Sequence, residues 1–214
     1  MDRARTPIRA VLFDADGVIQ HATADLETRL HTALGFVPDS IDDFLHDVYE
    51  AEWPALAGQQ DFVEALAPVL VKWGVEGSAG KLAACWSSIE ADTLILTLIG
   101  TLRGAGYFCA LATNQQRYRG AHMAHVLGYD VLFDRSFYSY EIGFRKPDAG
   151  FFHAVLASLP FQPQEMLFID DLEANVVAAA TFGLAAVQFV HDGSSKALPA
   201  LTSLLQQFSV RAST

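Results

Sequence analysis

The sequence predicts an α/β protein with a doubly wound parallel sheet, interrupted after its first strand by an inserted bundle of four helices. Two observations carry this prediction. From residue 92 onward, apolar strand-like runs alternate with helical patterns. Residues 20–91 instead show helical periodicity throughout, directly after a single strand-like run at residues 8–13. The predicted domains are therefore a core of residues 1–19 and 92–214, and a helical cap of residues 20–91 over the strand ends.

Four helices are predicted in the insertion because apolar residues recur there at helical spacing. Ser40 is the predicted N-cap of the second helix. The apolar positions are Leu26, Leu30 and Leu34, then Ile41, Phe44, Leu45 and Val48, then Phe62, Leu66, Val69, Leu70 and Trp73, and finally Leu82, Cys85, Trp86 and Ile89. The predicted breaks, each with Gly or Pro, fall at residues 35–38, 57–58 and 74–77. Amphipathic helices joined by short loops are typical of a small bundle.

The core is predicted from an alternating series of strands and helices. Strands are expected at residues 8–13, 107–112, 135–139, 166–169 and 185–190. Helices are expected at residues 94–102, 118–127, 148–159, 173–182 and 195–208. This alternation indicates a parallel sheet with helices on both faces. The carboxyl ends of such strands open at one edge, where active sites lie.

Composition limits the classes of partner. The chain has 214 residues, of which 51% are hydrophobic, and 14 Lys and Arg face 25 Asp and Glu for a net charge of −11. This charge argues against nucleic acid or an anionic membrane as the main partner. It leaves open a small phosphorylated substrate, because a local cation can invert the field of a pocket.

Cysteine usage and the start of the chain indicate a compartment. Cys85 and Cys109 lack the spacing of metal ligands and are expected to be buried thiols in a reducing compartment. The opening residues fit neither a signal peptide nor a membrane span. The expected location is the cytoplasm, and the oligomeric state stays open.

Asp14 and Asp16 are two carboxylates two positions apart, at the end of the first strand and before Gly17. Alternate strand residues point to the same side, so the two side chains are expected to meet. Like charges this close repel unless a proton or cation lies between them. Mg²⁺ suits such oxygen ligands. The alternative is a strand followed by an ordinary polar turn.

Polar residues also follow two later strands of the predicted sheet. Thr113 and Asn114 follow the second strand, Asp170 and Asp171 follow the fourth, and Lys146-Pro147 lies between them. This set suits phosphoryl transfer, because an Asp can attack phosphorus and a second carboxyl can move the proton. A cation and a lysine can neutralise the charge of the transferred group, while a hydroxyl and backbone amides hold its oxygens.

These motifs, in this order, resemble the haloacid dehalogenase superfamily, whose core is Rossmann-like and whose helical cap matches the insertion. The resemblance covers essentially the whole chain. The stretches 112–114 and 143–147 look most similar to its small sugar-phosphate phosphatases. The resemblance implies an Mg²⁺-dependent phosphatase that acts on a small phosphorylated metabolite, with sugar phosphates favoured, through an aspartyl phosphate.

The resemblance also implies a role for each matched residue. Asp14 looks like the nucleophile and a metal ligand, and Asp16 like the general acid/base, with its backbone carbonyl on the metal. Thr113, with the Asn114 amide, looks like the phosphate clamp, and Lys146 like the cation that pairs with Asp14 and phosphoryl oxygens. The implied ligands from the last motif are Asp171 and, beside it, Asp170. Asn175 stands where many relatives have an Asp, and is expected to lie behind the ligands.

Other functions remain open on the same residues. A 2-haloacid dehalogenase would attack carbon with Asp14 and need neither Asp16 nor a metal, so Asp16 and Asp171 favour phosphate. A phosphomutase would share every motif. A non-enzymatic phospho-acceptor domain would be shorter and lack the insertion, and a binding protein with a degenerate site would lack part of the set.

Residues outside the motifs are interpreted conservatively. Four cap residues could line a pocket but are expected to belong to helix surfaces or the bundle core: His21, Tyr49, Glu52 and Trp53. Arg145 is expected to face solvent. His122 and His125 are expected at the surface without a carboxylate partner. Side chains of the cap would set the choice of substrate, and the sequence does not identify them.

Overall fold

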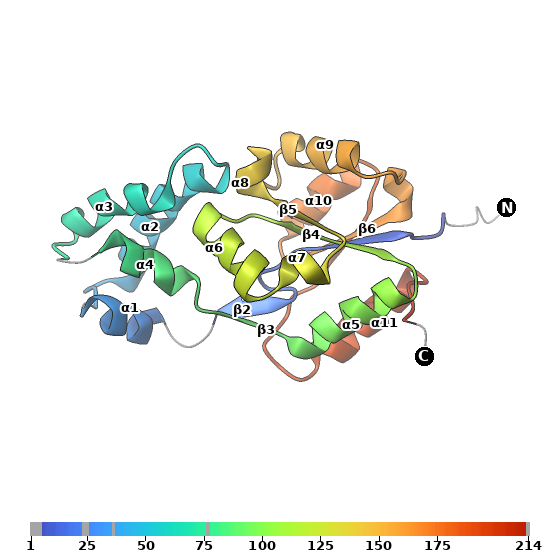
Figure 1. Ribbon diagram of the computed structural model, residues 1–214, viewed down its shortest axis with the longest axis horizontal. Helices are drawn as coiled ribbons and strands as arrows, with labels where there is room; N and C mark the ends of the chain where they lie inside the picture. The colour runs from blue at the N-terminus through green and yellow to red at the C-terminus, as the bar shows by residue number, and fades with distance from the viewer. Residues whose placement is uncertain (1–5, 23–25, 36, 76–77, 213–214) are drawn as a thin grey trace.

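The core is a five-stranded parallel sheet. The computed structural model describes residues 6–22, 26–35, 37–75 and 78–212, with the side chain of Leu26 left out (Figure 1). The strands lie in the order β5-β4-β1-β6-β7 and every pairing is parallel. The predicted fold class is therefore confirmed for the sheet. The strands are β1 (Ala10–Phe13), β4 (Phe108–Thr113), β5 (Arg135–Tyr138), β6 (Met166–Asp170) and β7 (Ala185–Gln188).

Helices cover both faces of the sheet (Figure 1). Strand β1 is central, and its side chains alternate between two apolar clusters, Val11 and Phe13 in one and Ala10 and Leu12 in the other. Burial on both faces explains why β1 is a continuous apolar run. One cluster includes residues of α5 (Thr93–Gly104) and α11 (Ala197–Gln207), and the other includes residues of α9 (Ala149–Ser158) and α10 (Glu173–Thr181).

Four helices form a separate unit with its own apolar cluster, here called the helical insert (Figure 1). They are α1 (Leu26–Leu34), α2 (Ile41–Leu56), α3 (Phe62–Lys72) and α4 (Ala79–Trp86). Ser40 caps α2 as predicted, because its side chain accepts a hydrogen bond from the Asp43 amide. Parts of two predicted breaks, at residues 36 and 76–77, and the side chain of Leu26 lie outside what the structure describes.

The insert joins the core through two short antiparallel strands that the sequence prediction omitted. Strand β2 (Gln20–Ala22) pairs with β3 (Ile89–Ala91), so the expectation of helices throughout residues 20–91 was wrong. Ile89 lies in β3 and not at the end of the fourth helix. Three residues are too short to show strand alternation, and the partners are far apart in sequence. The β2–β3 pair joins the two chain segments that connect the core to the insert.

The helix predicted at residues 118–127 is also different. The chain forms α6 (Arg117–Ala121) and then a π-helical turn, η1 (His122–Val126). A π-turn holds one more residue per turn than an α-helix, which no residue pattern signals. Three further short elements were not predicted: α7 (Tyr129–Leu132), α8 (Ser139–Ile142) and the 3₁₀ turn η2 (Pro163–Glu165). No described helix has the length and apolar character to cross a membrane.

Candidate active site

The carboxyl ends of β1 and β6 bring three carboxylates together, here called the acidic cluster. Asp14 follows β1, Asp170 ends β6 and Asp171 comes next. One carboxylate oxygen from each lies within 4.8 Å of the others. Gly17, with φ of +70°, closes the turn after β1, and a Cβ atom there would lie 2.6 Å from Asp171 Oδ2. Glycine at this position therefore lets the chain pass close to the cluster.

Lys146 is buried between two members of the cluster. Its Nζ lies 2.9 Å from Asp14 Oδ1 and 2.6 Å from Asp170 Oδ2, and the side chain is 1% exposed. Asn114 positions the lysine, because its Oδ1 accepts from the Lys146 amide at 2.8 Å and its Nδ2 donates to the Lys146 carbonyl at 2.9 Å. The Asn114 side chain is thus engaged with the Lys146 backbone.

Asp170 has both oxygens engaged. Oδ2 accepts from Lys146, while Oδ1 accepts from the Leu172 amide and from Asn175 Nδ2, each at 2.9 Å. Asn175 therefore lies behind Asp170. Burial, with Asp170 adding to it and Lys146 opposing it, raises the pKa of Asp171. Among the described residues, Asp171 has no cation within ion-pair distance, so its carboxylate is open to a ligand.

Asp14 is a buried carboxyl group whose charge is only partly compensated. Burial raises its pKa from 3.8 to about 7, with Lys146 opposing this rise and Asp170 adding to it. Its buried Oδ1 has no hydrogen-bond partner of good geometry among the described residues, although Lys146 Nζ is close. A divalent cation between Asp14 and Asp171 would satisfy this oxygen and stabilise the charged form of the cluster.

Asp16 does not join the acidic cluster. Its carboxylate points to α6, where Arg119 donates to both oxygens, at 2.6 Å to Oδ1 and 2.9 Å to Oδ2. Gln115 Nε2 donates to Oδ2 at 2.7 Å, and Gln20 Nε2 donates to Oδ1 at 3.0 Å. The sequence argument placed Asp14 and Asp16 on one side of a strand, but β1 ends at Phe13. Asp16 therefore lies beyond the strand, in an isolated bridge with Gln20 just before the turn, where strand alternation does not apply.

The charges around the strand ends sum to a simple imbalance. With every group in its ordinary charged form, Asp14, Asp16, Asp170 and Asp171 contribute four negative charges and Lys146 and Arg119 two positive ones, which leaves −4 + 2 = −2. An uncompensated buried charge is costly. The residues present thus fit one divalent cation, and the oxygen ligands suit Mg²⁺.

Thr113 is the last residue of β4, the strand that pairs with β1. It is 1% exposed, and its Oγ1 accepts from Gln115 Nε2 at 3.3 Å. The Gln115 amide donates to Ser139 Oγ at 2.9 Å, which fixes the turn after β4. The turn therefore holds Thr113 and the Asn114 amide at the same sheet edge as Lys146.

Helix α2 of the insert presents Tyr49, Glu52 and Trp53 toward the core, and these residues are here called the α2 face. The Arg145 guanidinium lies 3.3 Å from the centroid of the Trp53 ring, so Arg145 is engaged rather than free in solvent. Burial raises the pKa of Glu52 to about 7, with Arg119 opposing this and Asp16 adding to it. Glu52 thus lies within electrostatic range of the Asp16–Arg119 pair.

Two other contacts cross between insert and core. The Tyr118 hydroxyl donates to Asp61 Oδ2 at 2.9 Å. The rings of His21 and His191 stack with centroids 5.5 Å apart, and His191 Nε2 lies 2.9 Å from Asp92 Oδ2. His21 therefore belongs to the junction of the two units. On η1, His125 does have a carboxylate neighbour, Asp130 at 3.6 Å, contrary to the expectation of none.

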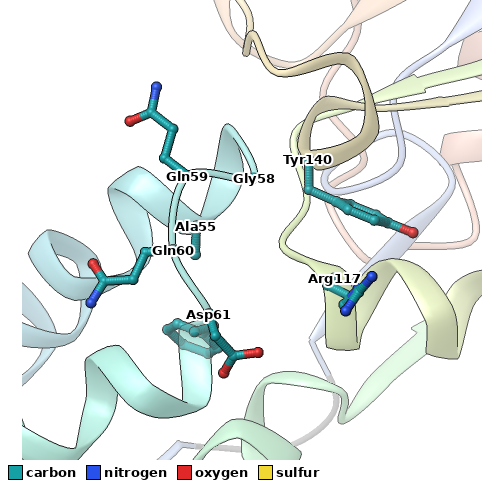
Figure 2. A pocket seen from close by; sticks show the side chains of 8 residues that line it. Ala55, Gly58, Gln59, Gln60, Asp61, Arg117 and Tyr140 are labelled. Atoms are coloured by element: carbon teal, nitrogen blue, oxygen red, sulfur yellow. The ribbon is translucent and has the colours of Figure 1, made fainter.

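A cavity of about 320 Å³ lies at the seam between the insert and the core. Figure 2 shows insert residues on one side and Arg117 and Tyr140 on the other. Its lining is Ala55, Gly58, Gln59, Gln60, Asp61, Phe62, Arg117 and Tyr140. No member of the acidic cluster lines this cavity, so it is separate from the candidate active site.

Sequence reasoning missed three residues of the site, Gln20, Gln115 and Arg119. Each contacts Asp16 through a side chain that the motifs do not include. Gln115 and Arg119 follow Thr113 closely, at the start of a helix, and this proximity to a motif was the available signal. Gln20 is fully buried in β2, a strand that was itself not predicted.

Comparison with known proteins identifies relatives of the chain. A family model described as haloacid dehalogenase-like hydrolase matches residues 8–183. A sesquiterpene phosphatase, astK, from Aspergillus oryzae is 31% identical over 114 residues, which are 52% of this chain and 58% of that protein. Drimenol cyclase drtB from Aspergillus calidoustus is 40% identical over 59 residues, 28% of this chain. The match spans 11% of drtB, so each match covers only part of the relative.

Solved structures share the fold. A haloacid dehalogenase family enzyme from Bacteroides thetaiotaomicron, in complex with magnesium and inorganic phosphate, has a TM-score of 0.73 and 22% identity, covering 89% of this chain and 98% of that one. The L-2-haloacid dehalogenase from Xanthobacter autotrophicus, with chloropropionic acid covalently bound, has a TM-score of 0.64 and 20% identity, covering 97% and 90%.

Proposed function

Because the chain belongs to the haloacid dehalogenase-like hydrolases, whose family model matches residues 8–183, we propose that it is an Mg²⁺-dependent phosphatase. Its substrate is a small phosphate monoester, whose phosphoryl group passes to Asp14 and then to water. One observation carries the proposal: the buried Asp14, beside Lys146, shares an acidic cluster with Asp170 and Asp171. This arrangement combines a nucleophile with a place for a phosphate-binding cation.

In the first half-reaction, a carboxylate oxygen of Asp14 attacks phosphorus and the bond from phosphorus to the leaving oxygen breaks. Asp16 donates the proton that the leaving oxygen takes. Lys146 neutralises charge on the phosphoryl group, and Thr113 Oγ1 with the Asn114 amide holds its oxygens. In the second half-reaction, Asp16 takes a proton from water, which attacks phosphorus and releases Asp14.

Asp14 and Asp171 hold the metal in this proposal, with the Asp16 backbone carbonyl as a third ligand. Asp170 would lie beside the ion, and its bonds to Lys146, Leu172 and Asn175 hold its carboxylate in place. When bound, Mg²⁺ supplies charge neutralisation for the phosphoryl oxygens. The charge imbalance of −2 at the site supports a divalent ion.

The relatives support phosphate chemistry over its alternatives. One relative is named a sesquiterpene phosphatase, and one structural neighbour holds magnesium and inorganic phosphate. A dehalogenase on this fold is the competing function. A second carboxylate at Asp16 and the acidic cluster around Asp171 favour the phosphatase, since attack on carbon requires neither. A phosphomutase would use the same residues and differ in its cap.

The substrate is a small metabolite, because we propose that the helical insert is a cap over the strand ends. Sugar phosphates are the first candidate, from the resemblance of stretches 112–114 and 143–147. An apolar phosphate is the second candidate. Tyr49 and Trp53 on α2 and Phe144, two residues before Lys146, expose about half of their surface, at 52%, 54% and 51%, and one relative is named a sesquiterpene phosphatase.

Nucleic acid and membrane are not proposed as partners, on the strength of the net charge of −11. A cytoplasmic location is proposed from Cys85 and Cys109, which are both buried and free.

The test is release of inorganic phosphate from an aryl phosphate with Mg²⁺ and with EDTA. The proposal predicts turnover with the metal and none with the chelator, whereas equal rates would reject it. A panel compared by kcat/KM then separates sugar phosphates, nucleoside monophosphates and prenyl phosphates. Halide release from 2-haloacids without phosphate release would establish the dehalogenase instead.

A further inference from the structure

Every acceptor position of the Asp16 carboxylate has a hydrogen-bond donor, and the side chains that donate to it are here called the Asp16 donors. Four N–H groups reach its two oxygens, two from Arg119 and one each from Gln115 and Gln20. A carboxylate offers about four lone-pair sites, so these donors use all of them. The Arg119 contacts are bidentate, at 2.6 and 2.9 Å, which is the strongest and most directional form of such a pair.

The Asp16 donors are themselves held in place by other contacts. The Gln20 amide is fully buried, and its Oε1 accepts from the Tyr129 hydroxyl at 2.9 Å. Gln115 is 1% exposed and is fixed through Ser139. The Arg119 amide donates to the side chain of Gln116, which caps α6. The Asp16 donors are therefore preorganised in the absence of substrate, and Arg119 is the only cation among those that the structure describes.

We propose that Arg119 is a positioning residue that keeps Asp16 in the orientation from which it accepts a proton from the attacking water. This inference rests on the proposed phosphatase function and adds a residue to it. The two bonds from Arg119 fix the orientation of the Asp16 carboxylate, because a bidentate fork is directional. With a substrate whose leaving group departs easily, loss of this orientation should slow the second half-reaction more than the first.

The step balances as follows. A new bond forms between the water oxygen and phosphorus while the bond from phosphorus to Asp14 breaks, and Asp14 keeps that electron pair. The water proton passes to an oxygen of Asp16, and inorganic phosphate leaves. One N–H donor must withdraw to free a lone pair for this proton. Gln20 makes the longest contact, at 3.0 Å, and has another acceptor in Met123 Sδ at 3.6 Å.

Glu52 on the α2 face offers a competing explanation for Arg119. Its buried carboxyl lies within electrostatic range of Arg119 and Asp16. Arg119 would then hold the insert against the core and affect catalysis only through closure. The two roles predict different kinetics, because loss of closure weakens both half-reactions, whereas loss of positioning slows the water step selectively.

The experiment is rapid-quench kinetics of p-nitrophenyl phosphate with Mg²⁺ for wild type, Arg119→Met, Arg119→Lys and Glu52→Gln. This substrate has a good leaving group, so its first half-reaction needs little help from Asp16. For Arg119→Met we expect a preserved first-turnover burst of nitrophenol and a steady-state rate about 10²-fold lower, at the low end of the ~10²–10⁴ that acid–base catalysis supplies. Phosphoenzyme should accumulate by mass spectrometry.

Matched variants separate positioning from structure. Arg119→Lys keeps the charge but loses the bidentate fork, so its rate should lie between wild type and Arg119→Met. Arg117→Met removes an exposed arginine from the same helix and should match wild type. Gln115→Leu should produce a weaker burst phenotype and serves as the second variant if Arg119→Met does not fold.

Two results would overturn the inference while phosphatase activity stands. One is equal slowing of burst and steady state in Arg119→Met and Gln115→Leu. The other is the same burst phenotype in Glu52→Gln, which would mean that the selective slowing of the water step does not depend on the bonds from Arg119 to Asp16. Absence of turnover in wild type would instead reject the proposed function and this inference with it.

Discussion

The acidic cluster and the α2 face both carry buried acids, but they are held in opposite ways. In the cluster, the buried Lys146 lies between Asp14 and Asp170. Asp170 also accepts a hydrogen bond from the Leu172 amide. On the α2 face, Glu52 is buried without an ion pair within 4 Å among the described residues, and Trp53 is half exposed. We propose that the core fixes the chemistry while the insert adjusts access to the site and selectivity.

Removal of the buried lysine should have the largest effect. Lys146→Met leaves Asp14 and Asp170 buried without their cation, which costs about 3–5 kcal/mol of unfolding free energy. Turnover should fall by about 10²–10³-fold or more, since a charge that faces the phosphoryl group is lost. Urea denaturation in metal-free buffer and phosphate release measure the two effects.

The matched control is Lys196→Met, which removes an exposed lysine that forms no ion pair among the described residues. Stability within about 0.5 kcal/mol of wild type is expected for it. If Lys146→Met were equally mild, the cluster would not be the fixed element of this comparison.

Asp16→Asn should come next, with a loss of ~10²–10⁴ in rate. Asn cannot exchange the proton, so protonation of the leaving group and hydrolysis of the phosphoenzyme should both slow. Rates for a series of aryl phosphates should depend more steeply on leaving-group basicity than in wild type. An unchanged slope would remove Asp16 from the acid/base role, and Asp192→Asn is the exposed control.

Glu52 should make stability depend on pH. Its pKa in the folded protein is about 7, against 4.5 when exposed, so the folded state keeps this proton to higher pH. The contribution of Glu52 to the free energy of unfolding is therefore greatest below pH 4.5 and is lost as pH rises to about 7. The expected loss is about 3 kcal/mol.

The Glu52→Gln variant has no titrating proton at this position. Its free energy of unfolding should therefore fall by about 3 kcal/mol less than that of wild type between about pH 4.5 and 7.5. Denaturant titrations of both proteins across this range measure the difference, which cancels the other titrating groups. Parallel stability curves would mean that Glu52 is solvated rather than buried on the α2 face.

The contact between Trp53 and Arg145 should give the smallest effect. Cation–π pairs contribute about 0.5–2 kcal/mol, so Trp53→Leu should raise KM several-fold and leave kcat nearly unchanged. Trp53→Phe keeps an aromatic face and should recover part of the loss. A fall in kcat with unchanged KM would place Trp53 in the chemistry rather than in access.

The two regions also differ in how well the sequence predicted them. Strand β1 was predictable because burial on both faces requires an apolar run, and the polar residues at the ends of β1, β4 and β6 had to meet at one edge. Lys146 could be included because it belongs to a motif in order with these ends. The structure confirms the sheet and brings Asp14, Lys146, Asp170 and Asp171 together.

Other features depended on contacts that no local pattern records. The β2–β3 pair joins residues about seventy positions apart through three-residue strands. Arg119 reaches Asp16 across 103 positions from a helix whose π-turn was not predictable. Glu52 was named among the cap residues, but its burial beside Arg119 follows from packing of the insert on the core.

The central claim is that Asp14 carries the phosphoryl group, and trapping the phosphoenzyme tests it most directly. Wild type is mixed with substrate and Mg²⁺, quenched in acid within the first turnovers and digested for peptide mass spectrometry. The account predicts one phosphoryl group on Asp14 in wild type, none in Asp14→Asn, and accumulation in Arg119→Met. A phosphoryl group on another residue, or turnover of Asp14→Asn at the wild-type rate, would contradict it.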